Sequence, residues 1–150
     1  MQNERAQKKG FTIIELLVAI VIIGILASIM IVSYTGIQQR SRDSERTSHT
    51  TQIKLALEKY RAEMSMYPAV CSGDNVGCRA SLLAAPLAPY LSIIPNDPRN
   101  PVDSATDYRY VRGSLAQDSY AILINYEARS VCKTGQNIQP TWWSTTFPSC

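Results

Sequence analysis

The sequence has only one histidine, His49, and it has no Cys-x-x-Cys pair, no Walker motif and no GxGxxG loop. One histidine gives a Ser–His–Asp or Cys–His arrangement few candidates. It also lies in a different segment from the cysteines, which argues against zinc. We therefore predict that the chain is not an enzyme and that it uses no metal and no cofactor.

Charge is also scarce in the segment that follows residue 10. Between Phe11 and Tyr34 the only charged residue is Glu15. The net charge of +3 comes mostly from residues 1–10, so the rest of the chain is close to neutral. This balance does not favour electrostatic binding of nucleic acid.

An apolar run of Leu, Ile, Val, Ala and Met extends from Leu16 to Val32, broken only by Gly24 and Ser28. Counted on to Tyr34, it would form a helix of about 28 Å, close to the thickness of a bilayer core. The basic residues before it place the N-terminus in the cytoplasm. A secretory signal would have a shorter apolar core and an A-x-A-like site. A plain anchor fits the length but explains neither the Gly-Phe pair before the run nor the carboxylate inside it.

All four cysteines follow the apolar run, and their even number suggests disulfides formed in an oxidising compartment. Four cysteines allow three pairings. We favour the sequence-local pairing, Cys71–Cys78 and Cys132–Cys150. The first would close a short loop, and the second would tie the chain end to the body.

The polar segment after the apolar run predicts a continuing, amphipathic helix. Ile53, Leu57, Tyr60 and Met64 follow helical spacing, and Pro68 ends the pattern. We expect one helix from Phe11 to Met66. The mixed charges at its centre predict a solvated face or salt bridges between subunits; they are Arg40, Arg42, Asp43, Glu45 and Arg46.

Two later segments, "DYRYVRG" and "SYAILINYEA", predict strands, with "SLAQD" as a hairpin connection. A third strand is expected around Ser130–Lys133 or Thr141–Thr145. The predicted fold class is α+β, in which a long N-terminal helix packs its amphipathic half on a small antiparallel sheet.

Surface contacts have several candidates near the C-terminus. Trp142 and Trp143 either cover the sheet edge, fill a subunit interface or contact an external surface. Four basic residues would form a patch if they shared one face, although acidic neighbours favour a mixed surface; they are Arg109, Arg112, Arg129 and Lys133.

The stretch "KKGFTIIELLVAIVIIGILASIMIV" closely resembles the N-terminus of type IV prepilins and pseudopilins. The resemblance implies that a prepilin peptidase cleaves between Gly10 and Phe11 and N-methylates Phe11. Glu15 is then the fifth residue of the mature chain. In this family it is expected to pair with the Phe11 amine of a neighbouring subunit and so to set the axial register. Many pilins have a proline in this helix, and here there is none.

The rest of the chain is similar to short pilins and to G-type major pseudopilins. The similar segments are "LALEKYRAEMSMYP", "LAPYLSIIPNDPRNP" and the disulfide-bounded "CKTGQNIQPTWWSTTFPSC". G-type pseudopilins commonly bind calcium near the C-terminus, but residues 128–150 contain no Asp or Glu. We therefore do not expect calcium here.

The expected organisation has five segments. They are a leader that is removed (1–10), a transmembrane or filament-core helix (11–34), its amphipathic continuation (35–67), a loop with the first cysteine pair (68–106), and the sheet with the C-terminal loop (107–150).

The resemblance implies a structural subunit of a type IV pilus-like filament serving motility, adhesion or DNA uptake. The alternatives are a pseudopilin of a type II secretion or competence system, and a filament subunit that binds DNA or a surface. The implied partners are further copies of the chain, the prepilin peptidase, a platform protein, an assembly ATPase and minor pilins. DNA is a further candidate partner, which the sequence itself does not support. Before assembly the chain would be a single-pass membrane protein with an exoplasmic head, and afterwards part of an extracellular pilus or periplasmic pseudopilus.

Overall fold

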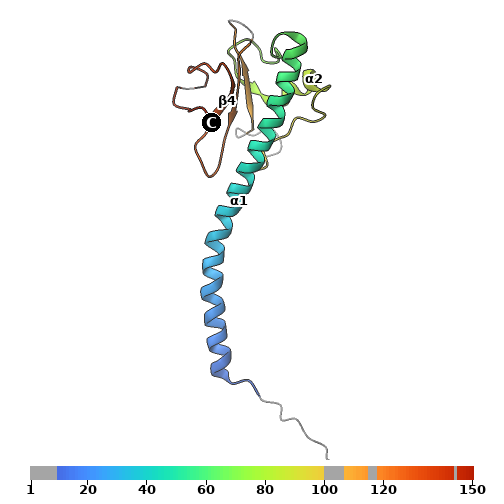
Figure 1. Ribbon diagram of the computed structural model, residues 1–150. Helices are drawn as coiled ribbons and strands as arrows, with labels where there is room; N and C mark the ends of the chain where they lie inside the picture. The colour runs from blue at the N-terminus through green and yellow to red at the C-terminus, as the bar shows by residue number, and fades with distance from the viewer. Residues whose placement is uncertain (1–9, 100–106, 115–117, 144) are drawn as a thin grey trace, which may run out of the picture. The chain divides into compact units, whose positions relative to one another are not determined.

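The computed structural model describes residues 10–99, 107–114, 118–143 and 145–150, with the backbone alone at residues 30–33. Two compact units divide the chain, one ending at Gln38 and the other, which we call the C-terminal unit, running from Gln39 to Cys150. A single helix, α1 (Ile13–Met64), passes from one unit into the other (Figure 1). The predicted leader, except for Gly10, lies outside the described residues.

The length of α1 follows from its composition and its two ends. No proline occurs between Ile13 and Met64, so no backbone hydrogen bond of the helix is lost to a proline ring. At the C-terminal end Ser65 adopts a left-handed conformation with φ of 59°, a common way for a helix to stop. The helix is therefore two residues shorter at each end than the sequence predicts.

The C-terminal unit contains a four-stranded antiparallel sheet in the order β1-β2-β3-β4. The strands are β1 (Cys78–Arg79), β2 (Arg109–Arg112), β3 (Tyr120–Ile124) and β4 (Cys132–Gln136). A short 3-10 helix, η1 (Ala80–Leu83), and α2 (Ala84–Leu87) follow β1. The C-terminal end runs beside β4 through a parallel bridge between Lys133 and Ser149.

This architecture confirms the predicted α+β class and the two strands expected in "DYRYVRG" and "SYAILINYEA". The third strand, β4, overlaps the expected Ser130–Lys133 segment. The alternative position, Thr141–Thr145, has no strand among its described residues. Strand β1 was not predicted, because two residues are too few to show a period of two. Most of "SLAQD" lies outside the described residues.

The main core lies between α1 and one face of the sheet (Figure 1). Ile53, Ala56 and Leu57 are fully buried against the tyrosines and isoleucines of β2 and β3. Tyr60 is half-buried and meets Tyr90 edge to face. The prediction that Met64 joins this stripe is wrong, because the helix ends there and its side chain is 52% exposed.

Tyr67, which follows the helix end, lies in this core instead. Its ring packs against Tyr120 with centroids 4.4 Å apart, and its hydroxyl donates to Glu58. On β2, the Tyr110 hydroxyl donates to the backbone carbonyl of Pro68. The core thus buries several tyrosines whose hydroxyls find partners, which avoids the cost of unpaired polar groups.

The opposite face of the sheet has a smaller cluster formed by Val111, Ala121 and Trp142. Trp142 is 3% exposed, so it covers this face of the sheet. Close backbone approach between β3 and β4 requires glycine at position 135. A side chain there would lie 2.1 Å from the carbonyl oxygen of Tyr120.

Candidate functional site

The N-terminal end of α1 is organised by a capping box between Thr12 and Glu15. The Thr12 backbone N–H and hydroxyl both donate to Glu15 Oε2, at 2.8 and 2.6 Å, and the Glu15 N–H donates back to Thr12 Oγ1 at 3.3 Å. The pattern T-x-x-E satisfies backbone donors that the first turn of a helix leaves unpaired. Thr12 is the residue of this site that the sequence reasoning missed, although the T-x-x-E signature could have revealed it.

The capping box engages only one oxygen of the Glu15 carboxylate. In the described part of the chain, no hydrogen bond reaches Oε1. Phe11, two residues before the helix, is 82% exposed, and Gly10 is exposed as well. Glu15 can therefore keep its cap and still accept a hydrogen bond from a cation outside this chain.

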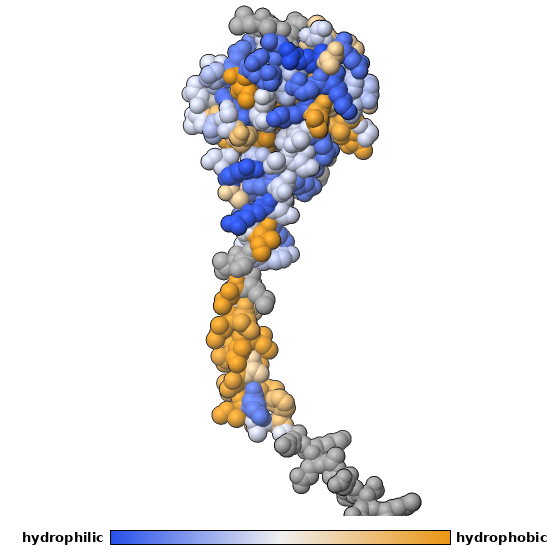
Figure 2. Space-filling view, viewed as in Figure 1, coloured by the Kyte–Doolittle hydropathy of each residue, from blue (hydrophilic) through white to orange (hydrophobic). Residues whose placement is uncertain are grey.

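The first part of α1 exposes apolar side chains at nearly every position from Ile13 to Ile29, and Figure 2 shows one face of this apolar surface. An 18-residue window of this helix has a mean hydropathy of 3.0 and none of it is buried, so by length and composition the helix can cross a membrane. Within the apolar run, Ser28 donates its hydroxyl to the Gly24 carbonyl at 2.8 Å. No described atom lies within 4 Å of a side chain built at Gly24. An exposed apolar surface of this size is expected to be buried against lipid or against other helices.

Within the C-terminal unit, Arg40 and Glu45 are exposed as expected, but Arg42, Asp43 and Arg46 join an ionic cluster inside the chain. Arg46 is 1% exposed and lies between three carboxylates. It donates from Nε and Nη2 to both oxygens of Asp97, from Nη1 to Asp43, and from Nη2 to Glu127. Arg42 forms a bidentate pair with the same Glu127. The expectation of a solvated face is therefore wrong for Arg46 and Asp43, because two loops fold over them.

This cluster joins three distant parts of the chain. Asp97 comes from the loop before β2, and Glu127 follows β3. The Asp43 carboxylate also accepts the backbone N–H groups of Glu127 and Ala128, both at 2.9 Å. Because a buried cation must be compensated by carboxylates in good geometry, the cluster fixes both loops to α1.

Hydrogen bonds from Arg42 and Arg46 lower the pKa of Glu127 from 4.5 to about 2. Since the folded state holds this carboxylate ionised, its stabilising contribution is complete above pH 4.5 and is lost as the pH falls towards about 2. We expect the urea midpoint of the full chain in detergent, followed by tryptophan fluorescence, to fall across this range. The Glu127→Gln variant should lose much of that pH dependence, and an unchanged acid profile in this variant would contradict the assignment.

The structure contains two disulfides. Cys71 and Cys78 have Cα atoms 5.4 Å apart, and Cys132 and Cys150 have Cα atoms 5.1 Å apart. These are the sequence-local pairs. The first closes a loop before β1, and the second attaches the C-terminal end to β4.

The two disulfide-bounded segments contact each other through Asn75. Its backbone N–H donates to the Arg112 carbonyl, and its side-chain oxygen accepts from Trp142 Nε1 at 3.0 Å. Trp143 packs against Gly77, where a side chain would come within 2.4 Å of the indole nitrogen. The tryptophans therefore hold the C-terminal loop against the Cys71–Cys78 loop.

Trp142 and Arg112 are consequently buried, so of the alternatives considered for Trp142 the structure fits the one in which it covers the sheet, and neither residue is placed for an external contact. Arg112 is 9% exposed, pairs with Asp74 and donates to the Tyr67 carbonyl. Trp143 and Arg109 are half-buried, and Arg109 donates to the Gly77 carbonyl. Sequence spacing could not show this, because each partner comes from a distant loop.

The four basic residues that would form a patch if they shared one face do not form a free basic surface. Lys133 is 3% exposed and donates to the carbonyls of Pro140 and Trp142. Arg129 stacks on Tyr126, with the guanidinium 3.7 Å from the ring centre. Among the described residues, no group of three histidine, cysteine or acidic side chains is arranged to hold a metal ion.

Comparison with known proteins gives two kinds of match. One covers the N-terminal motif, and the other extends over most of the chain. A family model described as a prokaryotic N-terminal methylation motif matches residues 5–31. Type II secretion system core protein G of Escherichia coli (strain K12) is 29% identical over 102 residues, 61% of this chain and 67% of that protein. The protein of the same name from Vibrio cholerae is 28% identical over 74% of this chain and 75% of its own length.

The type IV major fimbrial protein FimA of Dichelobacter nodosus is 44% identical over 54 residues, covering 36% of this chain and 35% of its own length. No solved structure matches the chain. An apolar helix that continues into a helix packed on a small antiparallel sheet defines a pilin-like subunit. With the methylation motif and these relatives, the chain is similar to type IV pilins and pseudopilins.

Proposed function

We propose that this chain is a structural subunit of a type IV pilus-like filament. The observation that supports this most strongly is the uncovered apolar half of α1, which carries one carboxylate with one oxygen unused. In a membrane, lipid covers the apolar surface. In a filament, the same helices of neighbouring copies cover one another, and close approach is easiest at small residues such as Gly24 and Ser28.

Cleavage of the leader would supply a cationic partner for Glu15. Cleavage between Gly10 and Phe11 creates an amino group on Phe11, which is a cation away from water once subunits pack. Pairing with Glu15 Oε1 of a neighbouring copy offsets the desolvation of both groups. Because Phe11 is exposed and Thr12 occupies only Oε2, the pair can form without breaking the capping box.

The partners follow from this function. A prepilin peptidase would cleave and N-methylate the chain, and a platform protein with an assembly ATPase would drive polymerisation, with minor pilins in the same filament. The N-terminus would face the cytoplasm before assembly, with the C-terminal unit on the exoplasmic side. The two disulfides favour an oxidising location for that unit.

A pseudopilin is the second candidate. The relatives named as type II secretion system core protein G align with 61% and 74% of this chain, whereas the fimbrial relative aligns with 36%. A pilin would form long surface filaments. A pseudopilin would instead be required for secretion of exported proteins, so deletion of its gene should leave those proteins inside the cell.

A third candidate, a subunit that binds DNA, has weaker support. Arg112 and Lys133 are buried and engaged, and Arg109 is half-buried and donates to a carbonyl. Affinity for DNA depends on lysine and arginine side chains that can neutralise phosphates.

Processing can be tested on the chain in its own membrane. We expect the mature chain to begin at methylated Phe11, and we expect Gly10→Leu to leave residues 1–10 attached, because a large side chain fills the cleavage position. Gln2→Leu, a similar change within the leader, should be processed normally. Intact-mass measurement distinguishes these forms, and a mature chain starting at another residue would contradict the proposal.

A further inference from the structure

A groove runs along α1 on the side facing the loop after β3, within the C-terminal unit. Its volume is about 680 Å³, and we call it the Arg129 groove. The residues that define it here are Arg40, Asp43, Ser44, Thr47, Ser48 and Arg129. Its polar groups are hydroxyls, one carboxylate, one amide and two guanidinium groups, set among apolar parts of the same side chains.

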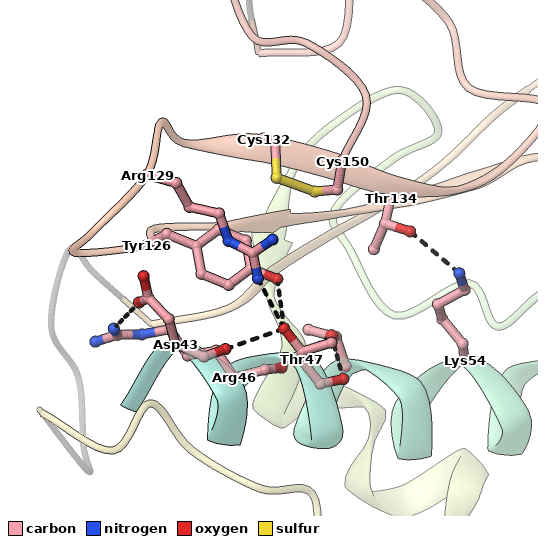
Figure 3. The surroundings of a disulfide bond; sticks show 10 residues. Asp43, Arg46, Thr47, Lys54, Tyr126, Arg129, Cys132, Thr134 and Cys150 are labelled. Carbon is pink, nitrogen blue, oxygen red and sulfur yellow. Dashed lines mark hydrogen bonds and ion pairs between the residues drawn. A yellow bond between two sulfur atoms is a disulfide. The ribbon is translucent and has the colours of Figure 1, made fainter. Parts of the chain in front are cut away.

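Arg129 is held in place without a carboxylate. Its guanidinium lies over the Tyr126 ring and donates to Thr47 Oγ1 at 2.9 Å (Figure 3). In the described part of the chain, neither Arg129 nor Arg40 forms an ion pair. The one carboxylate of the groove, Asp43, is already compensated by Arg46 and two backbone N–H groups. The groove thus carries unbalanced positive charge and fits an incoming anion.

Another flank of α1 carries an acidic group, Glu45, without a strong partner. Most carboxylates of the described C-terminal unit accept from arginine or tyrosine; these are Asp43, Glu58, Asp74, Asp97 and Glu127. Among the described residues, the ion-pair partner of Glu45 is His49 Nε2, at 3.6 Å, and the Glu45 side chain is 52% exposed. Glu45 follows Arg40 by five residues, a rotation of about 140° around α1, so the two lie on different flanks of one helix.

A helical filament is an open assembly, so each subunit must offer two different patches that fit each other. Helical symmetry also gives α1 the same direction in every copy, which lets a group on one flank of α1 reach the other flank of a neighbouring α1. We propose that Glu45 of one copy binds in the Arg129 groove of the next copy and pairs with Arg129 and Arg40. This contact rests on the proposed filament function and assigns one of its subunit interfaces.

The test reverses the charges of the full-length chain in cells and measures the chain recovered in sheared filaments. Arg129→Glu and Glu45→Arg should each lower that amount by about tenfold or more, because like charges then meet in the interface. The double variant restores the opposite charges and should recover filaments. Lys59→Glu, an exposed reversal on α1 outside the groove, is the matched control and should assemble normally.

Recovery in the double variant would also exclude misfolding as the cause of the single defects. Single variants that assemble like wild type, or a double variant as defective as the singles, would overturn the proposed contact. If the wild-type chain itself formed no filament, the filament function would fail together with the contact. Normal wild-type filaments with unaffected single variants would refute the contact alone.

Discussion

Replacement of Arg46 by alanine is expected to destabilise the C-terminal unit by about 3–5 kcal/mol, because it leaves buried carboxylates without their cation. Arg46 is 1% exposed and Asp97, its bidentate partner, is also 1% exposed. A loss of this size is a large fraction of the stability of a small domain. Urea unfolding of the full chain in detergent, followed by tryptophan fluorescence, measures it, since Trp142 is buried in the folded state.

Arg42→Ala is the matched control for this prediction. Arg42 binds the same Glu127, but its side chain is 30% exposed. Water can replace part of this interaction, so the expected cost is about 1 kcal/mol or less. If Arg46→Ala unfolded at the same urea concentration as Arg42→Ala, the cluster would not hold the loops on α1 as we describe.

Glu15→Ala is expected to lower filament yield by about a hundredfold or more. Without the carboxylate, the Phe11 amine of the next subunit would be buried uncompensated at a cost of about 3–5 kcal/mol per contact. The measurement is the amount of chain in sheared filaments relative to the amount in the membrane. Equal assembly of wild type and Glu15→Ala would refute a role in registry.

The Glu15→Gln variant distinguishes the role of the Glu15 charge from its role in the capping box. A glutamine at the third helical position can still complete a capping box with Thr12, so the start of α1 should stay intact. It cannot compensate a cation. We therefore expect Glu15→Gln to assemble as poorly as Glu15→Ala, whereas normal assembly would mean that Glu15 serves the helix end alone.

The sequence predicted those parts of the molecule that depend on local pattern. An uninterrupted apolar run and a helical stripe predicted α1, and aromatic and β-branched residues predicted β2 and β3. The family was also recognisable, because Gly10, Phe11 and Glu15 have a fixed spacing along the chain. Each of these signals lies within one short segment.

The ionic cluster and the position of the tryptophans could not be predicted in the same way. Arg46 appeared to be one of several alternating charges on a helix, and only its contacts with Asp97 and Glu127, 51 and 81 residues further on, bury it. Trp142 appeared equally suited to a surface, and only its packing on Val111 and Ala121 decides the matter. Such pairings depend on how loops fold over the sheet, which no periodicity within either segment encodes.

The most direct test of the filament function is mass spectrometry of filaments sheared from cells and identified by electron microscopy. We expect filaments whose repeating subunit is this chain, beginning at N-methylated Phe11 and containing both disulfides. Recovery of the chain only in the membrane, with residues 1–10 still attached, would contradict it.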